Sequence, residues 1–244
     1  MLPISIWSSG SKKVKIQVQP EAEVLVLAGD THTSPDGIVK YLKKLRREGV
    51  SIPIILVPGN HEYYKHDFNT VRRSYEKTLD SLPGVYWLDN NLVILGGVKF
   101  IGSTLYTDLS NPIAALYAKK NLTDFRVVTV NGHNFTTDQW TDLYWINYSF
   151  IETCLNISSR RTVVVTHMLP SWSLITEKFK GENTNAAFAV EMTDLMEKYK
   201  PAVWVYGHDH NPREDTRIYD TRVVCNQYGY YYEKLPYKPM IIDV

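Results

Sequence analysis

Residues 201–212 read PAVWVYGHDHNP, and the change of character within this stretch decides how the chain folds. The apolar run that leads up to Gly207 has the length and composition of a strand buried on both faces. Directly after Gly207 the chain presents His208 and His210, one residue apart. A strand that only fills a core has no need of two imidazoles at its end. The stretch therefore predicts a buried strand whose carboxyl end carries a functional site.

Three other runs rich in valine, isoleucine or leucine end in polar groups in the same way. They are EVLVLAGD (23–30), SIPIILVPGNH (51–61) and RTVVVTH (161–167). Further strands are predicted for 91–106, as a hairpin or two consecutive strands around Gly96 and Gly97, and for 221–230 and 239–244. Helical spacing of apolar residues predicts helices over 36–48, 68–80, 136–154 and 186–199. Alternating strands and helices predict an α/β layered fold.

No repeat, linker or change of composition divides the chain, so we expect residues 1–244 to form one domain. The segment 107–135 has little hydrophobic periodicity, and two interpretations stay open: a lid over the site or a surface loop. With 244 residues and 44% hydrophobic content, the chain is long enough to bury a sizeable core.

Charge and cysteine content narrow the classes of function. The formal net charge is +1, which disfavours nucleic acid as the main partner because phosphate backbones are bound by clustered Lys and Arg. The two cysteines, Cys154 and Cys225, have no paired spacing, which is typical of a reducing compartment. The sequence shows neither a secretory signal nor an apolar run of about 18 residues. We therefore expect a cytoplasmic protein that does not span a membrane.

The polar groups at the four strand ends form a set suited to a metal ion. Strand ends of a layered α/β fold lie together, so residues far apart in sequence can share one site. The set holds one carboxylate, one amide oxygen and three imidazoles, from Asp30, Asn60, His167, His208 and His210. Mixed oxygen and nitrogen ligands suit borderline divalent ions such as Mn²⁺, Fe²⁺, Zn²⁺ or Ni²⁺. Each element alone is common in proteins without metal, whereas their combination is specific.

The stretches LAGDTH, VPGNHEYY, VVVTHMLP and VYGHDHNP, in this order, resemble the successive motifs of the calcineurin-like metallophosphoesterase superfamily. The flanking stretches 84–108 and 221–230 are similar to segments of small bacterial and phage members. The resemblance runs from about residue 23 to the C-terminus. It implies a four-layer α/β/β/α sandwich of two mixed sheets, with one or two divalent ions in the site.

By this resemblance, Asp30 bridges two ions, Asn60, His167 and His208 complete the shell of one ion, and His210 serves the other. His61 resembles the residue that contacts the phosphate and protonates the leaving oxygen, a role that suits imidazole near neutral pH. The implied activity is metal-dependent hydrolysis of a phosphate mono- or diester, in which metal-activated water attacks phosphorus.

The sequence departs from the family at its first motif. An Asp-x-His pair is expected before Asp30, and Ser9 and Ser11 stand at the matching positions. Serine hydroxyls are poor ligands for these ions, so the first ion would keep only Asp30 and His210. The stretch Asp30-Thr31-His32 is itself an Asp-x-His pair and offers a rival alignment. In either alignment His32 is a candidate for a replacement nitrogen ligand.

Three functions therefore stay open: a working phosphoesterase, a catalytically impaired relative that binds a phosphorylated ligand or a protein, and a nuclease. Retention of the later ligands and His61 favours the first, the missing pair favours the second, and the neutral charge disfavours the third. The expected substrate is a phosphorylated small molecule or a nucleotide-like molecule. Tyr63, Tyr64, Tyr228 and Tyr230 would either stack on a base or pack the edges of the sandwich.

Overall fold

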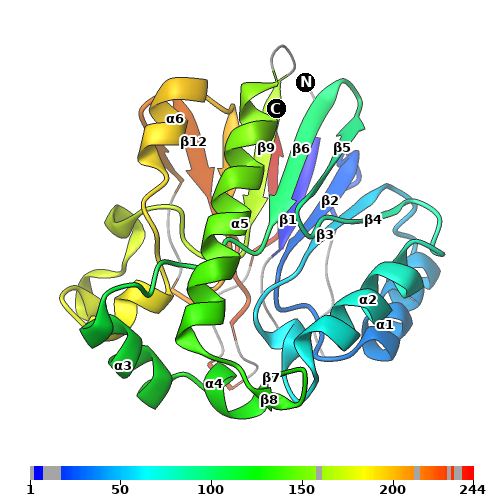
Figure 1. Ribbon diagram of the computed structural model, residues 1–244. Coiled ribbons are helices and arrows are strands. Elements are labelled where there is room, and N and C mark those ends of the chain that lie inside the picture. The colour runs from blue at the N-terminus through cyan, green and yellow to red at the C-terminus, as the bar shows by residue number, and fades with distance from the viewer. Residues whose placement is uncertain (1–2, 8–17, 158–160, 212–214, 230–231, 234–237) are drawn as a thin grey trace.

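The computed structural model describes residues 3–7, 18–157, 161–211, 215–229, 232–233 and 238–244 (Figure 1). Ser9 and Ser11 lie outside the described residues. The first sheet has the strand order β13-β1-β2-β3-β4. Its strands are β1 (Pro3–Trp7), β2 (Val24–Ala28), β3 (Ile54–Val57), β4 (Val85–Trp87) and β13 (Met240–Asp243). Strands β1 to β4 are parallel and β13 is antiparallel to β1, so the sheet is mixed.

The second sheet has the order β11-β12-β10-β9-β6-β5. Its strands are β5 (Asn91–Leu95), β6 (Val98–Ser103), β9 (Thr162–Thr166), β10 (Val203–Val205), β11 (Thr216–Ile218) and β12 (Thr221–Val224). The four central strands are parallel, and the edge strands β5 and β11 are antiparallel to their neighbours. The predicted hairpin of 91–106 is confirmed as β5 and β6, with Gly96 and Gly97 at positive φ in the turn.

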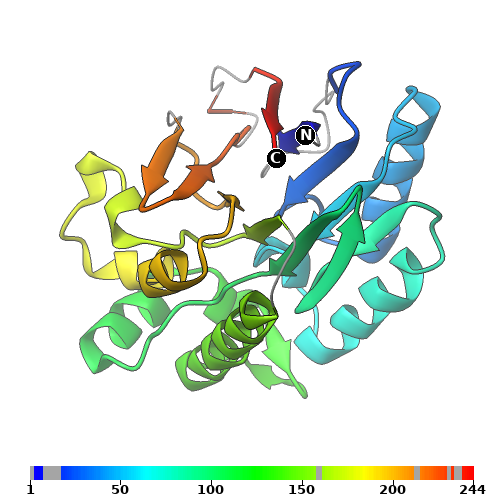
Figure 2. The same cartoon turned by 90° about the horizontal axis from the view of Figure 1, so that it is seen from above.

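Helices cover the outer faces of the two sheets. Helices α1 (Pro35–Arg47) and α2 (Phe68–Leu79) lie on the side of the first sheet, and α5 (Thr137–Asn156) and α6 (Thr193–Tyr199) on the side of the second. Seen from above, the helices lie outside and the sheets between them (Figure 2). The four-layer α/β/β/α sandwich of two mixed sheets, predicted from the resemblance, is therefore confirmed.

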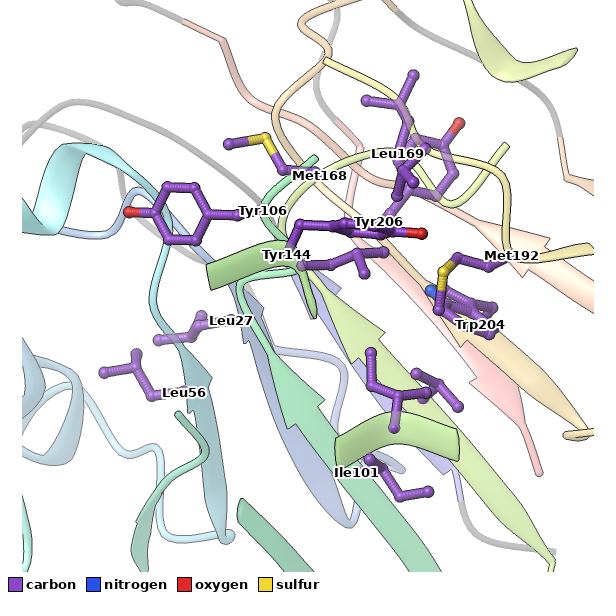
Figure 3. Packing of buried hydrophobic residues seen from close by; sticks show 14 of the residues in the cluster. Leu27, Leu56, Ile101, Tyr106, Tyr144, Met168, Leu169, Met192, Trp204 and Tyr206 are labelled. Atoms are coloured by element: carbon purple, nitrogen blue, oxygen red, sulfur yellow. The ribbon is translucent and has the colours of Figure 1, made fainter. Parts of the chain in front are cut away.

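Side chains that alternate along each strand fill two different cores. In β2, Val24, Val26 and Ala28 pack in the cluster between the sheets, whereas Leu25 and Leu27 pack in the cluster under the helices. All five are buried, which explains why the run lacks the polar alternation of a strand with one wet face. Figure 3 shows part of the helix-side cluster, including Leu27, Leu56 and Trp204.

The segment 107–135 contains regular structure that its sequence did not reveal. It forms α3 (Pro112–Asn121), α4 (Asp124–Val127) and a small hairpin of β7 (Thr129–Val130) and β8 (His133–Asn134). These elements lie at the lower end of the molecule in Figure 1. Helix α3 exposes Ile113 and Leu116 and buries Ala118, so it lacks the apolar stripe by which a helix is recognised in a sequence.

The predicted helix over 186–199 is shorter in the structure, where α6 begins at Thr193. Residues 188–192 instead run beside the loop after β9. Leu169 donates its N–H to Phe188 O, and Val190 donates its N–H to Leu169 O, both at 3.0 Å. These bonds occupy backbone N–H and C=O groups that would pair with one another in a helix. Three short 3₁₀ segments lie between β9 and α6: η2 (Trp172–Leu174), η3 (Glu177–Phe179) and η4 (Asn183–Ala187). A fourth, η1 (His61–Tyr63), lies between β3 and α2.

Among the described residues, no helix combines the length and the apolar character needed to cross a bilayer.

A buried lysine closes the carboxyl end of α5, and its removal should destabilise the fold. Lys99, in β6, donates from Nζ to the carbonyl oxygens of Cys154 and Ile157, both at 2.7 Å. These are carbonyls of the helix end, where the peptide dipoles favour a cation. We expect Lys99→Met to lower the free energy of unfolding by roughly 1–3 kcal/mol, measured by urea denaturation. Lys198→Met, which removes an exposed partner of Glu152, is the matched control and should change little. Equal stability of the Lys99 variant and the control would contradict the role of Lys99.

Candidate metal centre

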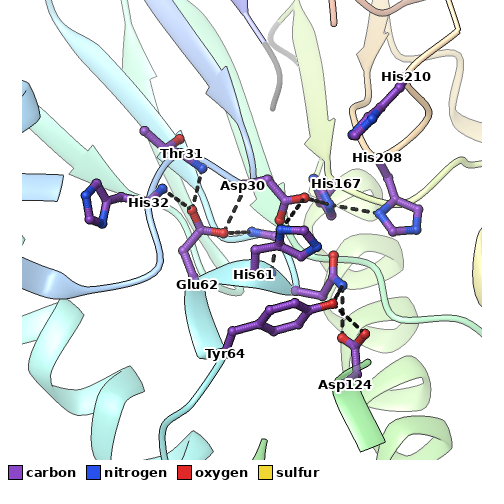
Figure 4. A network of polar contacts seen from close by, with 12 residues as sticks. Asp30, Thr31, His32, His61, Glu62, Tyr64, Asp124, His167, His208 and His210 are labelled. Carbon is purple, nitrogen blue, oxygen red and sulfur yellow. Dashed lines mark hydrogen bonds and ion pairs between the residues drawn. The ribbon is translucent and has the colours of Figure 1, made fainter. Parts of the chain in front are cut away.

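Three of the predicted ligands converge at the ends of strands from both sheets. Asp30 follows β2 in the first sheet, whereas His167 and His208 follow β9 and β10 in the second. One candidate ligand atom from each of these residues lies within 4.8 Å of the other two. Nε2 of His167 is 3.3 Å from Oδ2 of Asp30 and 3.1 Å from Nδ1 of His208 (Figure 4). Residues separated by up to 178 positions thus form one compact cluster, because both sheets present their strand ends to the same place.

The backbone is strained at two of these positions. Asp30 and His208 adopt φ values of 55° and 62°, in the left-handed region that non-glycine residues rarely occupy. Strain of this kind persists where surrounding structure enforces it, and it gathers at functional sites. Glycines allow the close packing: a Cβ on Gly29 would collide with the ring of His167, and one on Gly59 with the carboxylate of Asp30. Gly29 therefore allows the loop after β2 to lie against His167, and Gly59 allows the loop after β3 to lie against Asp30.

Hydrogen bonding fixes the orientation of the His167 ring. Its Nδ1 lies 3.0 Å from Ala28 O, and a carbonyl oxygen only accepts, so Nδ1 carries a hydrogen and Nε2 faces Asp30. Although burial favours the neutral acid, His167 and His61 hold the pKa of Asp30 well below its usual value. Burial and the neighbouring His167 hold the pKa of His208 well below its usual value. The cluster therefore offers an ionised carboxylate and a neutral His208, the states in which these groups bind metals.

Asn60 is oriented by Tyr64 and by Asp124, which belongs to the segment 107–135. Its Nδ2 donates to Oδ1 of Asp124 at 2.9 Å and to the hydroxyl of Tyr64 at 3.2 Å. The same hydroxyl donates to Oδ2 of Asp124 at 2.8 Å, and Asp124 is buried. Two acceptors thus fix the amide group and leave Oδ1 of Asn60 as the atom available to a ligand. This oxygen is buried and has no hydrogen-bond partner among the described residues.

Glu62 fastens together the two loops that carry Asp30 and Asn60. Its side chain is fully buried, and its Oε2 accepts from the N–H groups of Asp30 (2.9 Å) and Gly59 (2.7 Å). Its Oε1 accepts from the N–H groups of Thr31 (2.5 Å) and His32 (3.1 Å). Burial and the nearby Asp30 carboxylate raise the pKa of Glu62 to about 7. The sequence analysis passed over this glutamate, although it belongs to the GNHE stretch.

The donor set fits a divalent ion. Buried polar atoms without partners are rare in proteins, and Oδ1 of Asn60 lacks a partner among the described residues. Around an ion with bonds of about 2.1 Å, neighbouring ligand atoms lie about 3 Å apart, close to the separations of 3.1 and 3.3 Å between the atoms in the cluster. Asp30, Asn60, His167 and His208 would hold this ion.

The other predicted site residues lie around this cluster with different partners. His61 donates its backbone N–H to Oδ1 of Asp30 at 3.0 Å, and its Nδ1 is 3.8 Å from Oδ2 of Asp30. His210 is not in the compact group of ligand atoms, and its Nδ1 lies 2.8 Å from Oε2 of Glu233. Both histidines line the same pocket as Asp30 and His208.

The ring of His32, suggested by the sequence as a replacement ligand, lies apart from the compact cluster of Asp30, His167 and His208. Its ring packs over Gly37 at the start of α1, and its Nδ1 accepts from the N–H of Ser34 at 3.1 Å. Figure 4 shows the ring directed away from Asp30 and His167. The backbone N–H of His32 donates to Oε1 of Glu62 at 3.1 Å. Of the four tyrosines, Tyr63 stacks on Phe68 in the core, Tyr64 lines the pocket, Tyr228 is half-buried, and Tyr230 lies outside the described residues.

The fold and the cluster agree with the comparison to known proteins. The sequence model of the calcineurin-like phosphoesterases matches residues 11–212, so the chain belongs to this family of, in general, metal-dependent phosphoester hydrolases. An uncharacterized protein, L509, of Acanthamoeba polyphaga mimivirus is 25% identical over 240 residues, covering 88% of this chain and 81% of the relative. The crystal structure of phosphopantetheinyl hydrolase (PptH) from Mycobacterium tuberculosis superposes with a TM-score of 0.73 at 20% identity. The superposition covers 97% of this chain and 95% of that one, and it shows a shared fold.

Removal of the Asp124 carboxylate should weaken metal binding without touching a ligand. We expect Asp124→Ala to raise the dissociation constant for Mn²⁺ by about 10- to 100-fold, because the Asn60 amide loses the acceptor that orients it. The measurement is calorimetric titration of metal-free protein. Asp220→Ala is the control, since Asp220 is exposed and pairs with Lys200 on the surface. An unchanged dissociation constant in Asp124→Ala would contradict the orienting role.

Glu62→Gln should destabilise the protein although the two side chains have the same shape. Each carboxylate oxygen of Glu62 faces two N–H donors, so either orientation of the glutamine sets its own NH₂ group against two donors. We expect the free energy of unfolding of metal-free protein to fall by roughly 1–3 kcal/mol. Glu48→Gln, at an exposed position, is the control. If both variants unfold at the same urea concentration as the wild type, Glu62 does not fasten the loops.

Proposed function

We propose that this protein hydrolyses a phosphate mono- or diester, with Mn²⁺ or a similar divalent ion held by Asp30, Asn60, His167 and His208. The observation that carries the proposal is the orientation of these groups toward one another at the strand ends. Buried partners fix the orientation of the Asn60 amide and of the His167 ring. Side chains that only fill a core do not need such partners. Membership in the calcineurin-like phosphoesterases supports the same reaction class.

The residues around the ion would each take a defined part in the reaction. A divalent ion in such a site polarises a phosphoryl oxygen and lowers the pKa of bound water. The water oxygen forms a bond to phosphorus while the bond from phosphorus to the leaving oxygen breaks, and that oxygen needs a proton. His61 is placed to donate it, because its ring is only partly buried, lines the pocket and packs on Tyr64 with ring centroids 4.2 Å apart.

His210 keeps its proposed role as a ligand of a second ion, with an added partner. A carboxylate bonded to one nitrogen of a histidine fixes the orientation of the ring and thereby the direction of its other nitrogen. Glu233 stands in this relation to His210. The side chain of His210 is 17% exposed and that of Glu233 is 28% exposed. The pair lines the pocket that Asp30 also lines. We propose that the His210–Glu233 pair, rather than His32, supports binding on this side of Asp30.

A second candidate function rests on the position of His210 outside the compact cluster. The described residues gather the ligand atoms of one ion, and a single ion suffices to bind a phosphoryl group. The alternative is therefore a catalytically impaired member that binds a phosphorylated ligand. Such a protein would bind inorganic phosphate in a Mn²⁺-dependent manner without releasing product from a phosphate ester.

Turnover and its dependence on His61 separate the two candidates. We expect Mn²⁺-loaded protein to release phenol from phenyl phosphate or from diphenyl phosphate, whose leaving oxygen takes up a proton near neutral pH. His61→Ala should lower kcat by about 10²–10⁴-fold while the protein retains its metal. His133→Ala, at an exposed position of β8, is the control. Phosphate binding without turnover in the wild type would favour the binding protein, and unchanged kcat in His61→Ala would remove the proposed role of His61.

A further inference from the structure

A pocket of about 660 Å³ extends away from the candidate metal centre. Asp30, Asn60 and His208 line it together with His61. Its far part is lined by residues of the α3–α4 junction and of the segment around η3 and η4, which meet where α3 packs on η4. Pockets of about 300–1,000 Å³ accommodate molecules of the size of a drug or a cofactor, so a phosphoryl group alone would leave most of this space to solvent.

Apolar side chains form part of the pocket wall, beside polar ones such as Asn121, Thr176 and Asn185, and the first of the apolar side chains lies at the metal centre. Phe188 packs its ring against His208, with ring centroids 4.6 Å apart. Leu169 and Ile175 continue this surface from the core, and Leu122 and Phe179 extend it toward solvent. Leu122 comes from the α3–α4 junction and Phe179 from η3, so two separate segments contribute to the apolar wall.

The charges around the pocket are mostly negative. Glu182, Asp209 and Glu233 line it outside the metal centre, whereas Asp30 and Asp124 lie at the centre, where Asp124 is buried and bonded to Asn60. Among its described lining residues, Lys178 is the one lysine or arginine, and its Nζ lies 4.6 Å from the ring centroid of Phe179. Such a rim repels a ligand that carries further anionic groups, because like charges near a protein surface raise the cost of binding. Polyphosphates and nucleic acid strands are therefore poor fits for the far part.

The position of His61 relates this pocket to the reaction. The residue proposed to protonate the leaving oxygen lines the same pocket as Leu122 and Phe179. The group attached to that oxygen consequently lies in the pocket to which Leu122 and Phe179 contribute.

We propose that the alcohol released by this protein is a bulky, uncharged and largely apolar group, bound between Leu122 and Phe179. The inference rests on the proposed function for the phosphoryl end of the substrate, whereas the wall itself stands on the geometry of the pocket. The apolar wall would favour binding of phosphate esters of hydrophobic alcohols over nucleotides and over esters of small polar alcohols.

Phosphonates, which are not hydrolysed, test the proposal by binding alone. We expect 1-naphthylmethylphosphonate to bind Mn²⁺-loaded protein at least about 10-fold more tightly than methylphosphonate, because the aromatic ring is removed from water. Phe179→Ala and Leu122→Ala should each lower this ratio about threefold or more. Trp172→Ala, which removes an exposed aromatic ring from η2 outside the pocket, is the matched control and should keep the ratio. A ratio near one in the wild type, or a ratio that neither wall variant lowers, would overturn the proposal.

Two further probes test the exclusion of anionic groups and the dependence on Mn²⁺ separately from the effect of the apolar wall. 4-Carboxybenzylphosphonate should bind about 5-fold or more weakly than benzylphosphonate, and equal affinity would overturn the exclusion of anionic groups. 1-Naphthalenemethanol lacks the phosphoryl group and should bind weakly to the wild type and more weakly to Phe179→Ala, measured by ligand-observed NMR. If this alcohol binds but the phosphonates gain nothing from Mn²⁺, the proposed function fails and the wall stands. If phosphonates bind without preference for the naphthyl group, the proposed function stands and the wall proposal is wrong.

Discussion

The site depends on one buried carboxylate that accepts four backbone N–H groups. Glu62 lies between the loop after β2 and the loop after β3, and without an acceptor there the four donors would be buried unpaired. The bond to the N–H of Asp30 helps to hold that residue in its left-handed conformation, which turns its side chain toward the second sheet. The stability of the folded protein thus offsets the backbone strain in the loop after β2, and this loop places Asp30 in the site. The pKa of about 7 for Glu62 reflects the cost of placing its charge beside Asp30 in a dry interior.

The sequence predicted the layers and the converging strand ends because both follow from local patterns. Buried strands read as continuous apolar runs, and Asp30, His167 and His208 stand at the ends of such runs. Glu62 and Asp124 escaped the sequence analysis because their roles depend on contacts 30 to 64 residues away. Helix α3 escaped it because its exposed face is as apolar as its buried face. Segment 188–192 was assigned to a helix, since the backbone pairing with Leu169 leaves no signature in composition.

The pocket links these observations to the question of the substrate. The segment 107–135 was expected to be either a lid or a surface loop, and the structure gives it two contributions to the site. Asp124 orients the amide of Asn60, and Leu122 forms part of the apolar wall. Both residues lie at one helix junction, so the element that orients a metal ligand also shapes the space for the leaving group. A change in this junction would therefore alter metal binding and substrate choice together.

The central claim, that His167 and His208 hold a divalent ion beside Asp30, is tested most directly by pulsed electron paramagnetic resonance of bound Mn²⁺. Metal-free protein is loaded with Mn²⁺, desalted and measured beside its His167→Ala and His208→Ala variants. We expect at least one ion per chain in the wild type. We also expect nitrogen couplings from imidazole that weaken or disappear in each variant. A desalted protein without Mn²⁺, or a spectrum whose nitrogen couplings are the same in all three proteins, would contradict it.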